Sequence, residues 1–270
     1  AFVRQRVPVA VVGGQPFFGR AEVQDFLAYA VLARLDARKS LVRIRNKPGR
    51  FLGQAFDAAV QRFASGRDLV SAIRAAGATM RGGSREGAEK LAQEIEALRA
   101  LPWAAAPETQ DRDVPQRIVE LLTPVYVKEG GAADEDRAEM LETIAAIARQ
   151  FDGPKELIAF GRLCLGQVVN ASEAGDIPRG RVTLSTVHRA KGREWVTVVV
   201  SASLGMFPHA RSVGDDQSAE ELRLFYVAST RAKDRLWFTA SALGRRCGKR
   251  PDWADDLDDR PGFRGGRVEA

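Results

Sequence analysis

The sequence predicts an α/β protein in which a parallel sheet flanked by helices is interrupted by an all-helical insert. Short runs of β-branched and aromatic residues, typical of buried strands, occur near the N-terminus and again after residue 168. The stretch between them has helical periodicity instead. Because a short N-terminal strand and helix cannot bury a core by themselves, we expect the strands on both sides of the helical block to share one domain.

The elements follow in order along the chain. In the first part of the sheet domain, residues 1–45, "VPVAVVGG" predicts a strand ended by two glycines and "RAEVQDFLAYAVLARL" an amphipathic helix. The helical insert is expected at residues 46–167, where "SREGAEKLAQEIEALRAL" and "DEDRAEMLETIAAIARQF" alternate with Pro- and Gly-bearing breaks. The second part of the sheet domain, residues 168–250, contains three strand-like runs: "RVTLSTV", "WVTVVVSAS" and "RLWFTAS". Residues 251–270 are expected to form a flexible tail.

Composition bounds the class of protein. The 270 residues are 45% hydrophobic and carry a formal charge of +6, which favours polyanionic partners such as nucleic acid or nucleotide. With two cysteines, Cys164 and Cys247, and two histidines, we expect no metal site and a reduced, cytoplasmic setting. The sequence offers neither a secretory signal nor an apolar run long enough to span a bilayer, so we expect no membrane association.

The charged turn in "RVTLSTVHRAKGREW", residues 181–195, is the first functional signal. Ligands of open α/β sheets bind beyond the carboxyl ends of parallel strands, and this turn follows such an end. Gly192 permits a tight turn, and Glu194 offers acceptors for a ribose. The same turn carries three side chains that could face a phosphate backbone: Thr186, His188 and Lys191. A solvated basic turn is the alternative interpretation.

The second signal is "SAEELRLFYVASTRAKDRL", residues 218–236. Apolar residues surround nearly the whole helical wheel, which predicts a buried helix. Arg231 lies near the end of this helix, and a guanidinium close to a core is costly unless an anion pairs with it. A phosphate would serve, and so would an internal ion pair with Glu220 or Glu221.

These motifs together resemble a known family. "VTLSTVHRAKGREW", "GMFPHARS" and "EELRLFYVASTRAKDRL" are similar, in this order and spacing, to the C-terminal motifs of superfamily 1 DNA helicases of the UvrD, Rep and PcrA type. Upstream, "VPVAVVGGQPFFGRAEVQDFLAYAVLARL" and "RIRNKPGRFLG" resemble the segments that lead into the helical insert of the same family. The resemblance implies the second RecA-like domain of a single-stranded-DNA translocase, with its insert.

Residue roles follow from the resemblance alone. It gives Arg231 the γ-phosphate contact as an arginine finger and Glu194 the ribose contact, with Gly192 beside the nucleotide. It directs Thr186, His188, Lys191 and His209 toward the single strand and sets Asn46 and Arg50 near the DNA path at the base of the insert. Three features depart from the family: Arg193 and Trp195 replace the usual leucine and phenylalanine, Cys247 replaces an aromatic ring, and the insert is short.

A helicase motor also needs a phosphate-binding loop, G-x-x-x-x-G-K-[ST], and the sequence contains none. We therefore expect half of an ATPase whose Mg²⁺ and ATP phosphates are held by an N-terminal RecA-like domain, and whose chain alone is inactive. The start at Ala1 favours truncation. Expected partners are that domain, single-stranded DNA and a duplex junction. The alternative is a stand-alone DNA-binding or regulatory module of the same fold that does not hydrolyse ATP.

Overall fold

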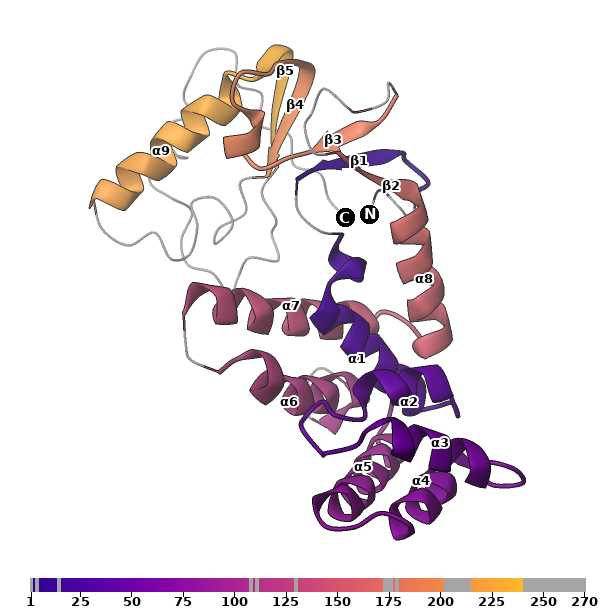
Figure 1. Cartoon of the computed structure of the whole chain (residues 1–270). Helices are drawn as coiled ribbons and strands as arrows, with labels where there is room; N and C mark the ends of the chain where they lie inside the picture. The colour runs from indigo at the N-terminus through magenta and orange to yellow at the C-terminus, as the bar shows by residue number, and fades with distance from the viewer. Residues whose placement is uncertain are drawn as a thin grey trace. The chain divides into compact units, whose positions relative to one another are not determined.

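The computed structural model has a mixed α/β fold with many helices. It describes residues 5–13, 16–106, 112–128, 131–171, 180–201 and 215–239, together with residues 2, 109 and 177. Five strands and nine α-helices occur in these ranges, with two short 3₁₀ turns at Phe17–Gly19 and His188–Ala190. The helices and strands, labelled in Figure 1, are β1 (Val9–Val12), α1 (Ala21–Leu32), α2 (Arg38–Ile44), α3 (Gln54–Phe63), α4 (Leu69–Ala78), α5 (Gly83–Ala100), α6 (Val114–Tyr126), α7 (Ala132–Ala148), α8 (Pro154–Gln167), β2 (Val168–Ala171), β3 (Val182–Leu184), β4 (Trp195–Ser201), α9 (Asp215–Ser229) and β5 (Ala232–Thr239).

The strands form two small sheets. Strands β2, β1 and β3 form a three-stranded sheet with β1 in the centre. The N-terminal strand therefore shares a sheet with the strand that follows the helical block, as the sequence predicts. Strands β4 and β5 form a separate parallel pair, whereas the sequence predicted that they would extend the same sheet.

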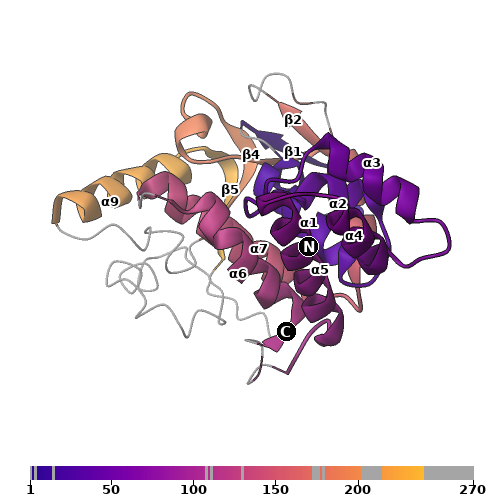
Figure 2. The ribbon, with the colours of Figure 1, turned by 60° about the horizontal axis from the view of Figure 1, so that its bottom comes forward.

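The chain divides into two compact units, one comprising residues 1–9 and 14–170 and the other residues 10–13 and 171–270. The predicted insert began at residue 46, but α1 already belongs to the helical unit. The reason is its apolar surface: Val23, Phe26 and Ala30 are fully buried, and α1 packs against α2, α6, α7 and α8. Figures 1 and 2 show α3, α4 and α5 gathered as a further group within this unit.

Aspartate caps fix two of the helix starts. Asp68 accepts hydrogen bonds from the backbone N–H groups of Val70 and Ser71, 3.0 and 3.1 Å away, at the start of α4. Asp113 caps α6 through the N–H of Gln116 at 2.8 Å, and Arg149 Nε pairs with its buried carboxylate at 2.7 Å. The Arg149 pair also ties the start of α6 to the end of α7.

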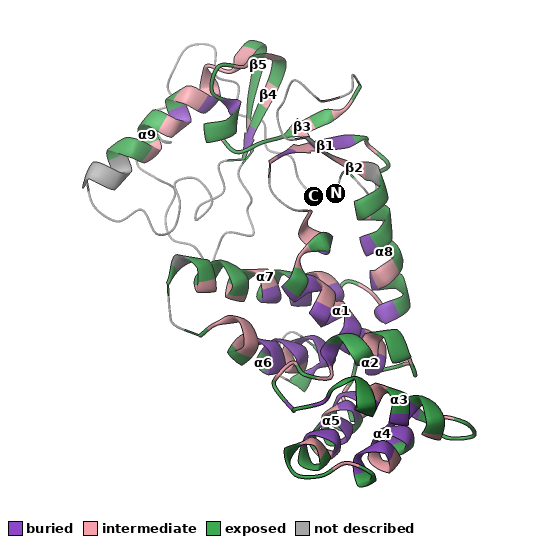
Figure 3. Ribbon diagram, viewed as in Figure 1, coloured by how far each residue is buried: buried purple, intermediate pink, exposed green. Residues whose placement is uncertain are grey.

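Helix α9 differs from its prediction. Its apolar residues encircle the helix, yet of the residues whose burial is described, 219–229, only Phe225 and Ala228 are buried, while Leu222 is 52% and Tyr226 70% exposed. The expectation that this helix is buried all round is wrong. Within the described residues α9 packs on one side only, against β4 and β5, where Phe225 stacks on Phe238 at 5.0 Å. Figure 3 shows how much of this element is exposed compared with the purple inner faces of α3 to α5.

In the part of the chain that the structure describes, no helix is both long and apolar enough to cross a membrane.

Candidate functional site

Glu194 and Arg231 are neighbours in the backbone at one end of the β4–β5 pair. The two strands run parallel with Trp195 paired to Ala232, and the Trp195 N–H donates to the Arg231 carbonyl at 2.9 Å. Each of the two candidate residues is one position before this pair. They therefore lie at the amino ends of β4 and β5, whereas the sequence argument had directed attention to carboxyl strand ends. Arg231 has this position because α9 ends at Ser229 and β5 begins at Ala232, so that Arg231 lies between the helix and the strand.

The Arg231 guanidinium is half-buried and hydrogen-bonded to neutral groups. Its Nε donates to the Val227 carbonyl at 2.9 Å, Nη1 to the Arg193 carbonyl at 3.3 Å, and Nη2 to the Thr230 hydroxyl at 2.9 Å. These bonds use three of the five N–H donors and fix the plane of the group. The arrangement holds a cation in place and leaves donors for an anion.

The alternative ion pair of Arg231 is not formed among the described residues. Glu220 instead pairs with Arg223, its own neighbour one turn along α9, at 3.1 Å. Both of those side chains are largely exposed, so this pair contributes little to stability. In the part of the chain that is described, no carboxylate neutralises Arg231.

Glu194 lies at the exposed end of the charged turn. Its carboxylate is 3.7 Å from Lys233 Nζ, and both side chains are more than half exposed. An exposed pair at this distance is weak and easily exchanged for other partners. The Glu194 oxygens can therefore accept hydrogen bonds from hydroxyl groups of a ligand.

The turn before Glu194 is organised by its backbone. The Thr186 carbonyl accepts hydrogen bonds from the N–H groups of Arg189 and Ala190, both at 3.1 Å, which forms the 3₁₀ turn after β3. Gly192 has φ +75°, a conformation that favours glycine. The result is an exposed basic turn that presents Thr186, His188 and Lys191 to solvent.

Arg189 contributes a contact that the sequence argument did not assign. Its guanidinium lies over Gly13, at the end of β1, where a Cβ would come within 2.3 Å of Arg189 Cζ. Gly13 also has φ +72°. The glycine pair after β1 was a visible signal, but nothing in the sequence linked it to a residue 176 positions later.

A loop in the helical unit carries the other two predicted DNA residues. Asn46 is exposed, and its side-chain oxygen accepts from the N–H groups of Arg50, at 3.2 Å, and Leu52, at 2.8 Å. Arg50 is only 3% exposed. Its Nη1 donates to three carbonyl groups at 3.2 Å each, those of Ile44, Arg45 and Pro48.

The other Arg50 nitrogen completes a buried network. Nη2 donates to the Tyr29 hydroxyl at 2.8 Å and pairs with Glu94. Burial raises the pKa of Tyr29 to about 12, so this phenol stays protonated and donates in turn to the Lys47 carbonyl. Arg50 therefore holds the loop in shape rather than reaching toward DNA with its side chain.

Phe51, in the same loop, has an unusual backbone conformation. It has φ +57°, rare for a bulky side chain, and the residue is 82% exposed. The Ser84 hydroxyl donates to its carbonyl at 2.7 Å, and the Arg50 carbonyl lies against Gly87, where a Cβ would be 2.1 Å away. The strained conformation is thus maintained by contacts on both sides.

Three predicted features lie outside the residues that the structure describes: His209, Cys247 and the tail at residues 251–270. Among the described residues, no group of three or more His, Cys, Asp and Glu side chains could hold a metal ion.

Comparison with known proteins decides the family. The model of the UvrD-like helicase C-terminal domain matches residues 1–242. The chain belongs to this family. The resemblance drawn from the motifs is thereby confirmed, and Glu194 and Arg231 both lie inside the matched range.

Curated relatives of this UvrD-like domain include two proteins named ATP-dependent DNA helicase PcrA. That of Staphylococcus aureus (strain MRSA252) is 30% identical over 254 residues, which cover 88% of this chain and 34% of the relative. That of Staphylococcus epidermidis (strain RP62A) is 28% identical over 253 residues, with the same coverage. The chain thus spans about a third of the length of these relatives, 34%.

Proposed function

We propose that this UvrD-like domain is the C-terminal portion of an ATP-dependent translocase on single-stranded DNA, and that it has the RecA-like fold with a helical insert. In this proposal Arg231 is the arginine finger and Glu194 binds the ribose. The observation that carries it is the position of these two residues: the N–H of Trp195, the residue after Glu194, donates to the carbonyl of Arg231. A cation and a carboxylate anchored this closely can act on the two ends of one nucleotide.

The chemistry of Arg231 fits a contact with a transferring phosphate. Its guanidinium is held by three neutral acceptors and has no carboxylate partner among the described residues, so its charge is available. During phosphoryl transfer, negative charge spreads over the equatorial oxygens of the γ-phosphate, and a fixed guanidinium stabilises it. Such a group contributes about a thousandfold or more to the rate in related phosphoryl-transfer systems.

In this proposal Glu194 contacts the ribose, and the exposed turn before it contacts the DNA strand. The carboxylate exchanges its weak contact with Lys233 for the ribose hydroxyls, while Gly192 shapes the turn beside the nucleotide. Thr186, His188 and Lys191 then face the strand, and His209 and Asn46 extend the track. Arg50 supports this path by holding its loop.

The nucleotide in this proposal is ATP with Mg²⁺. The metal and the β- and γ-phosphates are held by an N-terminal RecA-like domain, which this chain would meet as part of the same enzyme. ATP supplies the phosphoryl group, and the residues of this chain contribute the γ-phosphate and ribose contacts. In this proposal the UvrD-like domain of this chain also contacts a duplex junction during unwinding.

Turnover measurements in the parent enzyme test the assignment. Arg231→Ala is expected to lower DNA-stimulated ATP turnover by about a thousandfold and leave DNA affinity nearly unchanged, because the lost group acts on the phosphate. Arg231→Lys should restore little, since an ammonium cannot reproduce the planar fork. Arg223→Ala, an exposed change on the same helix, is the control. Near-normal turnover of Arg231→Ala would contradict the proposal and favour a purely structural role for Arg231.

A further inference from the structure

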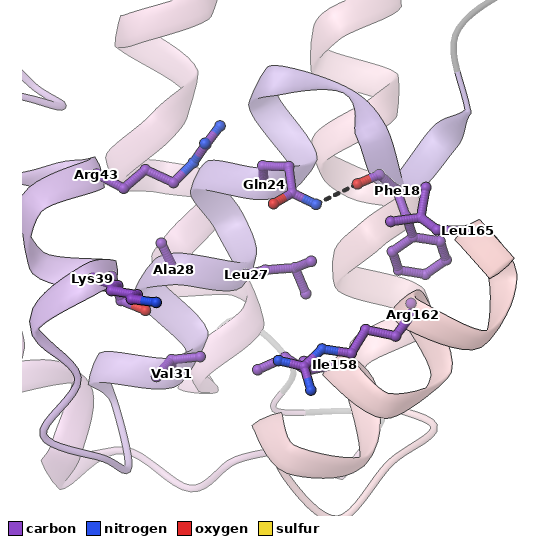
Figure 4. Close-up of a pocket in the computed structure, with 12 residues that line it drawn as sticks. Phe18, Gln24, Leu27, Ala28, Val31, Lys39, Arg43, Ile158, Arg162 and Leu165 are labelled. Carbon is purple, nitrogen blue, oxygen red and sulfur yellow. Dashed lines mark hydrogen bonds between the residues drawn. The ribbon is translucent and has the colours of Figure 1, made fainter.

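An apolar groove with a cationic rim lies within the helical unit, along α1 and between α2 and α8. Its volume is about 350 Å³, near the lower end of ligand pockets in proteins. Figure 4 shows Leu27 of α1 and Ile158 of α8 extending into the space between these helices, with Lys39, Arg43 and Arg162 around it. All of these residues belong to the same compact unit.

The spacing of the lining residues gives the groove its direction. On α1 they are Gln24, Leu27, Ala28 and Val31, and on α8 they are Ile158, Gly161, Arg162 and Leu165. Both sets follow the i, i+3, i+4, i+7 pattern of one helix face. The groove is therefore walled by two helix faces, which is the geometry that accommodates the apolar side of a third helix.

The charges of the lining residues indicate which kind of helix the groove could bind. None of the described residues that line the groove is acidic, and three are basic. Arg43 Nε pairs with the buried carboxylate of Asp25 at 2.7 Å, but neither Lys39 nor Arg162 has an ion-pair partner in the described part of the chain. An occupant with acidic side chains beside its apolar face would complement both remaining charges.

Nucleic acid does not fit this groove. Of the lining residues that the structure describes, Phe18 alone is aromatic, and it is 5% exposed. Its ring packs against Phe17 and Phe160 and lies under Gly161, where a Cβ would be 2.9 Å from the ring. Bases would thus find no stacking surface.

We propose that this groove binds an acidic amphipathic helix of a partner protein. Leucine-type side chains of the partner would enter between Leu27 and Ile158, and its carboxylates would pair with Lys39 and Arg162. Leu165, which is 42% exposed in this chain, would become buried. The inference is independent of the nucleotide site, because the described residues that line the groove lie between Phe18 and Leu165, whereas Glu194 and Arg231 lie at the β4–β5 pair.

A synthetic peptide titration tests it with the full 270-residue chain. The probe is a fluorescent amphipathic helix of about four turns, with leucines on one face and glutamates beside them. Saturable binding is expected, and Leu165→Asp or Arg162→Glu should weaken it by about tenfold or more, through lost apolar burial and reversed charge.

The helix supplies its own controls. Leu163 is 41% exposed, almost as much as Leu165, and it does not line the groove; Lys155 is likewise exposed and outside it. Leu163→Asp and Lys155→Glu should therefore bind the probe like the unmodified chain, and the circular dichroism spectra of all four variants should agree. The proposal is overturned if the probe does not bind, if the control variants lose as much affinity as the groove variants, or if a lysine version of the peptide binds equally well.

Discussion

Replacing Arg50 tests whether its side chain holds a loop in shape or contacts DNA. The side chain is 3% exposed and serves three carbonyl groups, the Tyr29 hydroxyl and Glu94. Arg50→Ala would leave these acceptors, including the partly buried Glu94 carboxylate, without their donor. Removing one member of a buried charged pair costs about 3–5 kcal/mol, so we expect a loss of at least about 3 kcal/mol in the free energy of unfolding of the helical unit.

Urea unfolding followed by circular dichroism measures this loss. With a slope of about 2 kcal/mol/M, the midpoint should fall by roughly 1.5 M. Arg50→Lys should also destabilise the unit, because an ammonium cannot serve all five acceptors together. Arg38→Ala, at an exposed position before the same loop, should change the free energy by less than about 0.5 kcal/mol. The reasoning is refuted if Arg50→Ala keeps the stability of the unmodified chain while the salt slope of DNA binding falls by about 0.7–0.9, the signature of one lost phosphate contact.

The remaining predictions concern Phe51 and the isolated chain. Because Phe51 has φ +57°, Phe51→Gly should be about 1 kcal/mol more stable than Phe51→Ala in the same unfolding assay, whereas at the exposed helical position Val42 the order should reverse; alanine ahead of glycine at both positions would exclude strain at Phe51. The 270-residue chain alone should release no phosphate from ATP and should bind labelled single-stranded oligonucleotide weakly, with a shallow salt slope. DNA-stimulated hydrolysis by this chain would refute the half-site proposal, and tight, salt-resistant binding would favour the stand-alone module.

Local pattern was enough to predict most elements. The 3.6-residue repeat in "SREGAEKLAQEIEALRAL" places a helix where α5 lies, and the β-branched run "WVTVVVS" is β4. The motif order was sufficient for the family because three long motifs in register rarely coincide by chance. Glu194 and Arg231 could be chosen from the same motifs. Their proximity at one end of the β4–β5 pair could not be predicted, because it depends on the register between the two strands.

Tertiary context decided what local pattern could not. The apolar residues of α9 predicted burial on all sides, yet the neighbours of this helix in the described residues cover one face only. The family resemblance set Arg50 near the DNA path, but its Nη1 and Nη2 groups donate to backbone carbonyls, the Tyr29 hydroxyl and Glu94, partners that its sequence neighbourhood does not reveal. Helix α1 has buried residues on several sides and packs with the helical unit, contacts that its own periodicity does not reveal.

The most direct test of Arg231 compares the affinity of the parent enzyme for two nucleotide states. ADP lacks the transferring phosphate, whereas ADP with aluminium fluoride mimics it in the transition state, and an arginine finger acts only on the second. We predict that Arg231→Ala leaves the affinity for ADP within about twofold and lowers the affinity for ADP with aluminium fluoride by roughly a hundredfold or more. Equal losses for both ligands, or no loss for either, would contradict the assignment of Arg231 to the γ-phosphate.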